Sequence, residues 1–169
     1  MIIIFDGVDN CGKTEISHGL VQHVLKDHTY FKVKQERIHV EKLDPKILQK
    51  SHELQLNFFY ELARQSNLNI VMDRFYPSEY VYGSLFREID EELLWEFDKK
   101  FAELGVKIII PVKGDSFLED ELWSKEQLVT IREKYKEFAR KTSCEVLVLD
   151  TEDENLEREL SDIKTFLKI

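Results

Sequence analysis

The sequence predicts a three-layer α/β/α fold in which helices cover both faces of a parallel five-stranded sheet. Short apolar runs alternate with longer amphipathic stretches along the chain, which is typical of repeated strand–helix units. The first apolar run leads directly into a glycine-containing turn, and 169 residues can bury a core without disulfides or a structural metal. Crossovers between such parallel strands are right-handed, and we expect a single domain over residues 1–169.

The first predicted strand and the turn after it organise the chain. Residues 1–5 read M-I-I-I-F, an apolar run suited to a buried parallel strand. Residues 7–14 read G-V-D-N-C-G-K-T, a complete G-x-x-x-x-G-K-T phosphate loop, and a helix pattern follows it. Such a loop presents backbone N–H groups at a helix N-terminus to phosphate oxygens. The sequence therefore predicts a nucleotide site at this turn.

Most positions of the loop have an expected role. Gly7 lets the chain turn sharply out of the strand, and Gly12 removes a Cβ where the backbone approaches phosphate. Lys13, expected at the surface, reaches the β- and γ-phosphates of the bound nucleotide, and the Thr14 hydroxyl ligates Mg²⁺. A nucleotide and Mg²⁺ are thus the expected ligands of the loop. The expected cofactor-binding residues are Gly7, Asn10, Cys11, Gly12, Lys13 and Thr14.

The next stretch is expected to hold a helix, an edge strand and a second helix. The helix after the loop should end near Asp27, and the many charges of residues 30–40 favour a strand at the sheet edge. Glu41 would follow at the carboxyl end of that strand, where it is a candidate general base and substrate-binding residue. A solvated loop carboxylate is the other interpretation. Asp44 and Pro45 open a long amphipathic helix.

A second chemical motif follows the next buried strand, residues 68–72. Asp73 comes directly after this strand and should lie at its carboxyl end. Parallel strands present their carboxyl ends at one edge of a sheet, so Asp73 should face the phosphate loop. Arg74 beside it carries a planar, permanent charge suited to phosphate. Asp73 and Arg74 are therefore candidate catalytic residues together with Lys13.

The second half of the chain continues the alternation of helix and strand. Ser124 and Gln127 resemble a capping box, and Thr151 is expected to cap the last helix. The short acidic segment 113–123 occupies the place of a mobile flap. The predicted elements are a helix over 90–104, a strand over 106–112, a helix from 124, a strand over 145–149 and a helix to about 167.

The composition limits which partners the protein can bind and in which compartment it works. A net charge of −9 argues against nonspecific binding to DNA or RNA, which needs many cationic side chains. The two cysteines, Cys11 and Cys144, do not have metal-site spacing and indicate a reducing compartment. No apolar run approaches the roughly 20 residues of a membrane helix, and Met1 leads straight into the first strand, which leaves no room for a signal peptide. We expect a cytoplasmic protein, and a homodimer is left open.

With both motifs in hand, the chain resembles the thymidylate kinase and deoxynucleoside kinase branch of P-loop kinases. Residues 5–14, F-D-G-V-D-N-C-G-K-T, look like the thymidylate kinase opening, in which an acidic residue, here Asp9, approaches the sugar of the bound nucleotide. Residues 73–75, D-R-F, stand where that family has Asp-Arg-Tyr. Ser78 and Tyr82 match the serine and tyrosine that follow it. The resemblance covers most of the chain, and it implies the P-loop kinase fold with the strand order 2-3-1-4-5.

The resemblance implies transfer of the γ-phosphoryl of ATP to a small acceptor nucleotide or nucleoside. Such transfer needs positioning and charge neutralisation more than covalent chemistry. By similarity, Lys13 would hold the donor, Thr14 and Asp73 would bind Mg²⁺, and Arg74 would bridge the moving phosphoryl. The substrate-binding residues implied are Asp9, Phe58, Arg64, Arg74 and Tyr82, and the position of Glu41 at a strand end adds a sixth. Arg64 would meet an acceptor phosphate. Phe58, Phe59, Tyr80 and Tyr82 are candidates to stack on the acceptor base, and each of the four also fits the core.

Three departures from the family pattern affect the assignment. No R-E-P-G-like segment follows the second strand, and segment 113–123 has no arginine to stabilise the transition state. Arg132 or Arg87 could substitute for it. Gly83 stands after Tyr82, where a glutamine often reads thymine, so the base preference is open.

Three functional hypotheses follow. The first is a deoxynucleoside monophosphate kinase, with a pyrimidine such as dTMP or a modified one as acceptor. The second is a kinase for a free deoxynucleoside or for a modified base hydroxyl in DNA, which shares the fold and differs in its acceptor contacts. The third is an ATP-binding module without phosphoryl transfer.

Overall fold

The computed structural model describes residues 1–33, 44–65, 69–114, 116 and 123–169. Five strands and six helices alternate within these ranges. They are β1 (Ile2–Phe5), α1 (Lys13–His23), β2 (Thr29–Lys32), α3 (Pro45–Gln65), β3 (Ile70–Asp73), α4 (Tyr76–Phe86), α5 (Glu91–Glu103), β4 (Lys107–Val112), α6 (Lys125–Lys141), β5 (Glu145–Asp150) and α7 (Leu156–Leu167).

All strands of the sheet are parallel, in the order β2-β3-β1-β4-β5. The predicted strand order is therefore confirmed. The register pairs Asp73 with Phe5 on one side and with Lys32 on the other. The carboxyl ends of β1, β2 and β3 consequently meet at one edge of the sheet, which is where the phosphate loop begins.

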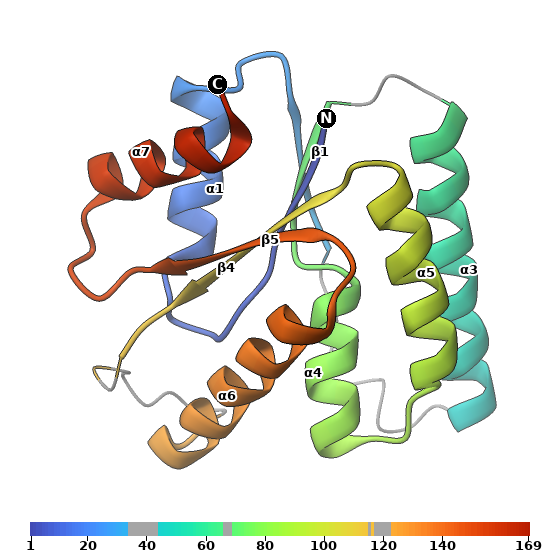
Figure 1. Cartoon of the computed structure of the whole chain (residues 1–169). Helices are drawn as coiled ribbons and strands as arrows, with labels where there is room; N and C mark the ends of the chain where they lie inside the picture. The colour runs from blue at the N-terminus through green and yellow to red at the C-terminus, as the bar shows by residue number, and fades with distance from the viewer. Residues whose placement is uncertain (34–43, 66–68, 115, 117–122) are drawn as a thin grey trace.

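Helices cover both faces of the sheet, as the three-layer prediction requires (Figure 1). Ile3 and Phe5 of β1 pack into a core with α1 and α7, whereas Ile4 packs into the larger core of α3, α4, α5 and α6. Successive side chains of a strand point to opposite faces, so a four-residue strand such as β1 contributes to both cores. This accounts for the unbroken apolar run at the start of the chain.

Three helices begin with a cap where the sequence predicts a helix start, and the cap of a fourth helix differs from the prediction. Asp44 accepts a hydrogen bond from the backbone of Lys46 at the start of α3, Asp90 caps α5, and the Ser124 capping box begins α6. The prediction that Thr151 caps the last helix is wrong, because Asn155 does so. The Thr151 hydroxyl instead hydrogen-bonds the carbonyl of Cys11 at 3.2 Å, which ties the end of β5 to the phosphate loop.

Two other boundaries differ from the sequence analysis. Helix α1 ends at His23 rather than near Asp27. Strand β2 is Thr29–Lys32, and residues 34–43, which include the rest of the predicted strand and Glu41, lie outside the described ranges. Strand β2 is an edge strand, as its charges predicted.

Helix α4 was not predicted, because its N-terminus has no local cap. Phe75 stands at the N-cap position and offers no side-chain acceptor. The carboxylate of Asp6, at the end of β1, takes that role: its Oδ2 accepts from the backbone N–H groups of Phe75 at 3.0 Å and Ser78 at 2.9 Å. A cap supplied from another strand leaves no signature in the local sequence.

The same carboxylate joins three elements of the fold. Its Oδ1 accepts hydrogen bonds from the backbone N–H of Gly7 at 2.9 Å, the hydroxyl of Ser78 at 2.6 Å and the hydroxyl of Tyr135 at 2.7 Å. Asp6 is fully buried, and a buried carboxylate is tolerated when its lone pairs are satisfied in this way. Asp6 therefore fixes the phosphate loop, α4 and α6 relative to one another.

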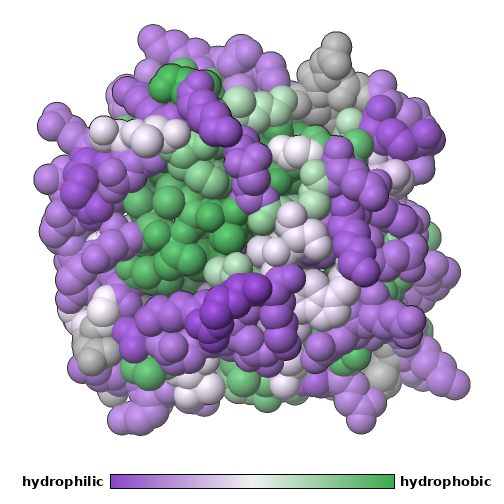
Figure 2. Space-filling model, viewed as in Figure 1, coloured by the Kyte–Doolittle hydropathy of each residue, from purple (hydrophilic) through white to green (hydrophobic). Residues whose placement is uncertain are grey.

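The outer edge of the sheet at β5 is partly uncovered. Figure 2 shows apolar surface over this strand, between α6 and α7, and Val148 is among its exposed residues. The phosphate loop lies at the carboxyl edge instead, so this apolar area is separate from the loop.

No helix within the described ranges is long and apolar enough to cross a membrane.

We predict that Asp6→Asn lowers the free energy of unfolding by about 2–4 kcal/mol. Each carboxylate oxygen accepts at least two hydrogen bonds, so an amide NH₂ in either orientation faces donors. Urea denaturation measures the loss. The matched control is Asp90→Asn, because asparagine caps a helix as well as aspartate and should change stability by less than about 0.5 kcal/mol. Equal effects of the two substitutions would contradict the role given to Asp6.

Candidate functional site

The phosphate loop runs from the end of β1 to the start of α1. Asn10 and Gly12 have positive φ angles of 64° and 78°, and Gly12 at the N-cap supplies no side chain to the first turn of α1. The first backbone N–H groups of that helix therefore remain for an anionic ligand. A Cβ on Gly7 would lie 2.8 Å from the carbonyl oxygen of Pro111, so the close approach of β4 requires this glycine.

Lys13 is buried, contrary to the expected surface position. It is only 7% exposed, and its Nζ donates to the carbonyl of Val8 at 2.5 Å. Burial lowers the pKa of Lys13. Burial raises the pKa of the neighbouring Cys11 thiol, whose Sγ donates to the same carbonyl at 2.9 Å. The loop thus folds around the lysine ammonium, with the thiol in its neutral form.

Asp73 gathers three donors at the carboxyl edge. Its Oδ2 accepts from the Thr14 hydroxyl at 2.9 Å, the Tyr30 hydroxyl at 2.8 Å and the Lys32 ammonium at 2.8 Å. Burial acts to raise the pKa of Asp73, but these hydrogen bonds outweigh it and lower the pKa below its usual value. Asp73 is 1% exposed and remains an anion.

Thr14 and Asp73 fit the role of magnesium ligands. Mg²⁺ in nucleotide sites takes one or two protein oxygens and completes its shell with waters and phosphate oxygens. A hydroxyl and a carboxylate 2.9 Å apart supply such oxygens, and the Oδ1 of Asp73 is a buried oxygen with no hydrogen-bond partner among the described residues. Clusters of three or more His, Cys, Asp or Glu are absent from these residues, but a nucleotide-bound magnesium does not need one.

Arg74 turns from the end of β3 toward the phosphate loop. Its φ of 69° is left-handed, a conformation that costs a non-glycine residue roughly 1–3 kcal/mol, and a hydrogen bond from its N–H to the carbonyl of Phe5 at 2.8 Å holds it. The guanidinium pairs with Asp9 and reaches the Gly7 carbonyl at 3.4 Å. Asp73 and Arg74 therefore lie on the same edge of the sheet as Lys13.

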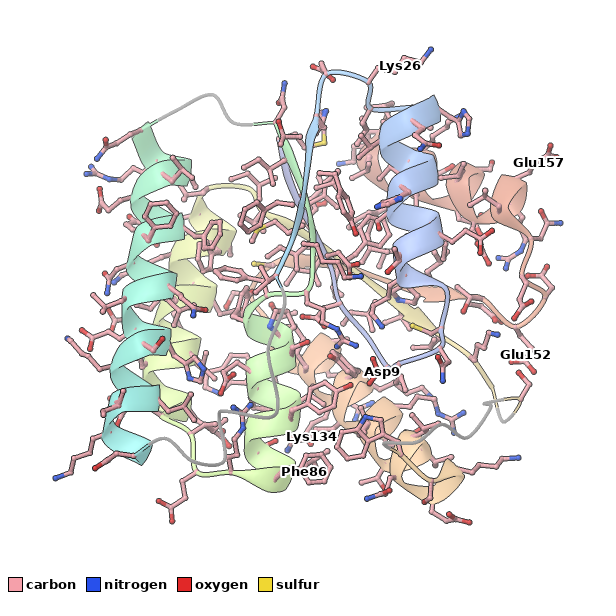
Figure 3. The ribbon with its side chains drawn as sticks, turned by 180° about the vertical axis from the view of Figure 1, so that it is seen from behind. Asp9, Lys26, Phe86, Lys134, Glu152 and Glu157 are labelled. Carbon is pink, nitrogen blue, oxygen red and sulfur yellow. The ribbon has the colours of Figure 1, made fainter. Side chains whose placement is uncertain are left out.

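Asp9 lies between the phosphate loop and an aromatic cluster. Besides Arg74, it accepts from the Tyr82 hydroxyl at 3.3 Å and the Trp123 indole at 3.1 Å. Phe86 stacks on Trp123 with ring centroids 4.9 Å apart. Figure 3 shows Asp9 between the start of α1 and the helices α4 and α6. Tyr82 was predicted at the site. Trp123 was not, because it carries no motif beyond its position before a helix cap.

Two predicted substrate-binding residues do not reach this edge. Arg64 lies in the last turn of α3, shortly before β3 begins, so it is at the amino edge of the sheet. It is exposed and pairs with Glu61 at 2.8 Å. Phe58 is 61% exposed, and the aromatic residue of α3 that packs on Phe75, at 4.8 Å, is Phe59. The structure therefore does not bring Arg64 and Phe58 to the phosphate loop, and their contacts with the acceptor stay predictions.

A narrow crevice separates α3 from α4 beside the end of β2. Its volume of about 20 Å³ holds roughly one water molecule, and His52, Gln55 and Glu79 supply its polar lining. Glu79 is buried, its Oε2 lies 3.2 Å from His52 and from Arg87, and its Oε1 has no partner within the described ranges. Burial lowers the pKa of His52 to about 4 and raises that of Glu79. No sequence motif links the members of this group, because they lie on two different helices.

The two arginines suggested as substitutes for a flap arginine occupy different places. Arg87 is held by Glu79 at the end of α4. Arg132 of α6 donates to the carbonyl of Lys113 at 3.1 Å and to that of Gly114. Arg132 therefore contacts the start of segment 113–123, the region in which the resemblance expects such an arginine.

No family model and no curated protein matches the sequence. Solved structures, in contrast, share its fold along nearly the whole chain. The YorR protein from Bacillus subtilis, in complex with phosphorylated GDP, is 20% identical with a TM-score of 0.72, over 99% of this chain and 96% of that one. Thymidylate kinase from Ehrlichia chaffeensis is 18% identical with a TM-score of 0.58, over 99% and 98% of the chains.

Deoxyadenosine kinase from M. mycoides, with the products dCMP and dCDP bound, is 14% identical with a TM-score of 0.55 and is matched over 99% of both chains. At these identities the comparison establishes the fold alone, and the reaction must be argued from the residues of the site. The predicted resemblance to the thymidylate and deoxynucleoside kinase branch is confirmed at the level of the fold.

Proposed function

We propose that this protein transfers the γ-phosphoryl of ATP to a small acceptor, either a deoxynucleoside or a deoxynucleoside monophosphate. One observation carries the proposal: the end of the phosphate loop meets the Asp-Arg pair of a neighbouring strand. Thr14 hydrogen-bonds Asp73 at 2.9 Å, and Arg74 reaches the Gly7 carbonyl. A phosphate chain lying on the loop is then flanked by a guanidinium and a carboxylate, the groups that phosphoryl transfer needs.

The residues would act by position and charge. Backbone N–H groups of the loop and the ammonium of Lys13 bind the β- and γ-phosphates once Lys13 releases the Val8 carbonyl. Arg74 lies across the same loop and neutralises charge on the transferring group. Mg²⁺ held by Thr14 and Asp73 would add charge neutralisation on the phosphate oxygens. Asp9, with Tyr82 and Trp123 donating to it, is placed to accept a hydrogen bond from a sugar hydroxyl.

We place the acceptor in the crevice between α3 and α4. Glu79 lies on α4, five positions after Arg74, and its buried Oε1 can accept a hydrogen bond from an N–H group of a base. The crevice must widen to admit a base, and side chains of α3 such as Gln55 form its other wall. The edge of a nucleobase carries N–H donors, and one of them could supply the hydrogen bond that Glu79 Oε1 lacks.

The placement of Arg64 favours the uncharged acceptor. The monophosphate hypothesis relied on Arg64 to meet an acceptor phosphate, but this residue is paired with Glu61 at the amino edge. A deoxynucleoside does not need it. A modified base in DNA is a weaker candidate, because a chain with a net charge of −9 has little attraction for a polyanion. The convergence of Thr14, Asp73 and Arg74 likewise argues against a module that only binds ATP.

We predict that a panel of deoxynucleosides and deoxynucleoside monophosphates, assayed with ATP and Mg²⁺, contains a phosphate acceptor. Lys13→Ala and Asp73→Asn should each reduce its turnover by at least about 100-fold, because each removes charge from the proposed phosphate site. Lys26→Ala is the matched control, since Lys26 lies at the far end of α1 from Asp9 (Figure 3). ATP binding without transfer to any acceptor would favour the non-catalytic module.

A second prediction concerns the acceptor. Glu79→Gln should raise the KM for the acceptor about 10-fold or more while the KM for ATP stays within about twofold, because a charged acceptor of the base is lost. Arg64→Ala should change neither constant. Steady-state kinetics with each substrate varied in turn gives both values. A higher acceptor KM in Arg64→Ala, with Glu79→Gln unaffected, would place the acceptor elsewhere and restore the monophosphate hypothesis.

A further inference from the structure

Lys32, the last residue of β2, occupies a position that the sequence did not assign to any function. Its ammonium lies 2.8 Å from Asp73 Oδ2 and 3.0 Å from Thr14 Oγ1. These are the two oxygens proposed above to hold Mg²⁺. A protein cation therefore contacts both of the groups that a metal cation would bind.

Charge balance explains why a cation is needed there. Asp73 is almost fully buried, and a buried carboxylate without a compensating charge is strongly destabilising. The hydroxyls of Thr14 and Tyr30 donate to the same oxygen, but neither carries charge. Lys32 supplies the missing positive charge and keeps Thr14 and Asp73 together.

Geometry explains why this cation can leave. The Lys32 side chain is 42% exposed and belongs to an edge strand, so its flexible stem can swing into water without a change in the backbone. The ammonium and a divalent metal cannot both contact Asp73 Oδ2 and Thr14 Oγ1, because like charges at about 3–4 Å repel strongly at a partly buried site. Binding of the metal requires Lys32 to move.

A second atom of the same carboxylate supports this exchange. Asp73 Oδ1 is buried and has no hydrogen-bond partner among the described residues, although Oδ2 accepts three hydrogen bonds. A buried acceptor without a partner calls for a ligand. The carboxylate thus keeps one oxygen ready while Lys32 holds the other.

We propose that Lys32 is a displaceable cation that competes with Mg²⁺ for Thr14 and Asp73. The proposal rests on the function proposed above. Lys32 keeps the two metal-binding oxygens in place and lowers the affinity of the site for metal. Only a metal delivered with the phosphates of the nucleotide, which add negative charge, displaces it. Lys32 is therefore a positioning residue that couples metal binding to nucleotide binding.

The test measures how strongly Mg²⁺ tightens nucleotide binding. The dissociation constant of a non-hydrolysable ATP analogue is determined by calorimetry in EDTA and in saturating Mg²⁺, and the ratio of the two constants gives the coupling. In Lys32→Met this ratio should rise about 10-fold over that of the natural protein, because the competing charge is gone. Lys26→Met, which removes the same charge far from the site (Figure 3), should leave the ratio unchanged, and Lys32→Arg should not raise it.

The outcomes separate this proposal from the function on which it rests. If neither the natural protein nor any variant binds the analogue, the proposed function fails. If all of them bind it with one common ratio, only the role of Lys32 fails. A lower ratio in Lys32→Met would show that Lys32 assists the metal, which also overturns the proposal. Should Lys32→Met not fold, as judged by thermal unfolding, Lys32→Gln gives the same comparison with a hydrogen-bonding side chain.

Discussion

The carboxylate of Asp6 is the interaction on which the rest of this structure depends. From the end of β1 it accepts hydrogen bonds from the phosphate loop, from two backbone N–H groups at the start of α4 and from Tyr135 of α6. A buried carboxylate must satisfy its oxygens or destabilise the fold, so these elements are held at fixed positions around it. The phosphate loop and the segment that follows Arg74 are held near each other because Asp6 accepts hydrogen bonds from both, at Gly7 and at Phe75.

A second buried anion, Asp73, holds the proposed catalytic groups together, as Asp6 holds the elements of the fold. Around these two carboxylates stand Lys13, Lys32 and Arg74, and each of these cations has a protein partner: Val8, Asp73 and Asp9. Phosphates entering the site would compete with those partners for the same cations. The strained backbone of Arg74 fits this account, because strain at a residue held by its surroundings is characteristic of functional sites.

The sequence predicted the features that depend on residues close together in the chain. The phosphate loop and the Ser124 capping box could be read from local patterns, whereas the strand order was implied by the family resemblance. Helix α4 could not, because its cap is Asp6, 69 positions from Phe75 in the chain. Arg64 lies away from the phosphate loop because α3, a helix of 21 residues, spans about 30 Å, and Arg64 is in its last turn. Lys32, Glu79 and Trp123 carry no motif, and only the fold brings them to the site.

The proposed function requires that Lys13, Thr14, Asp73 and Arg74 form one triphosphate site. A crystal structure with a non-hydrolysable ATP analogue and Mg²⁺ would show whether they do. In that complex we expect Lys13 Nζ to leave the Val8 carbonyl for the β- and γ-phosphates, with Arg74 facing the γ-phosphate from the opposite side. A triphosphate bound elsewhere, with Lys13 still on the Val8 carbonyl, would rule this site out.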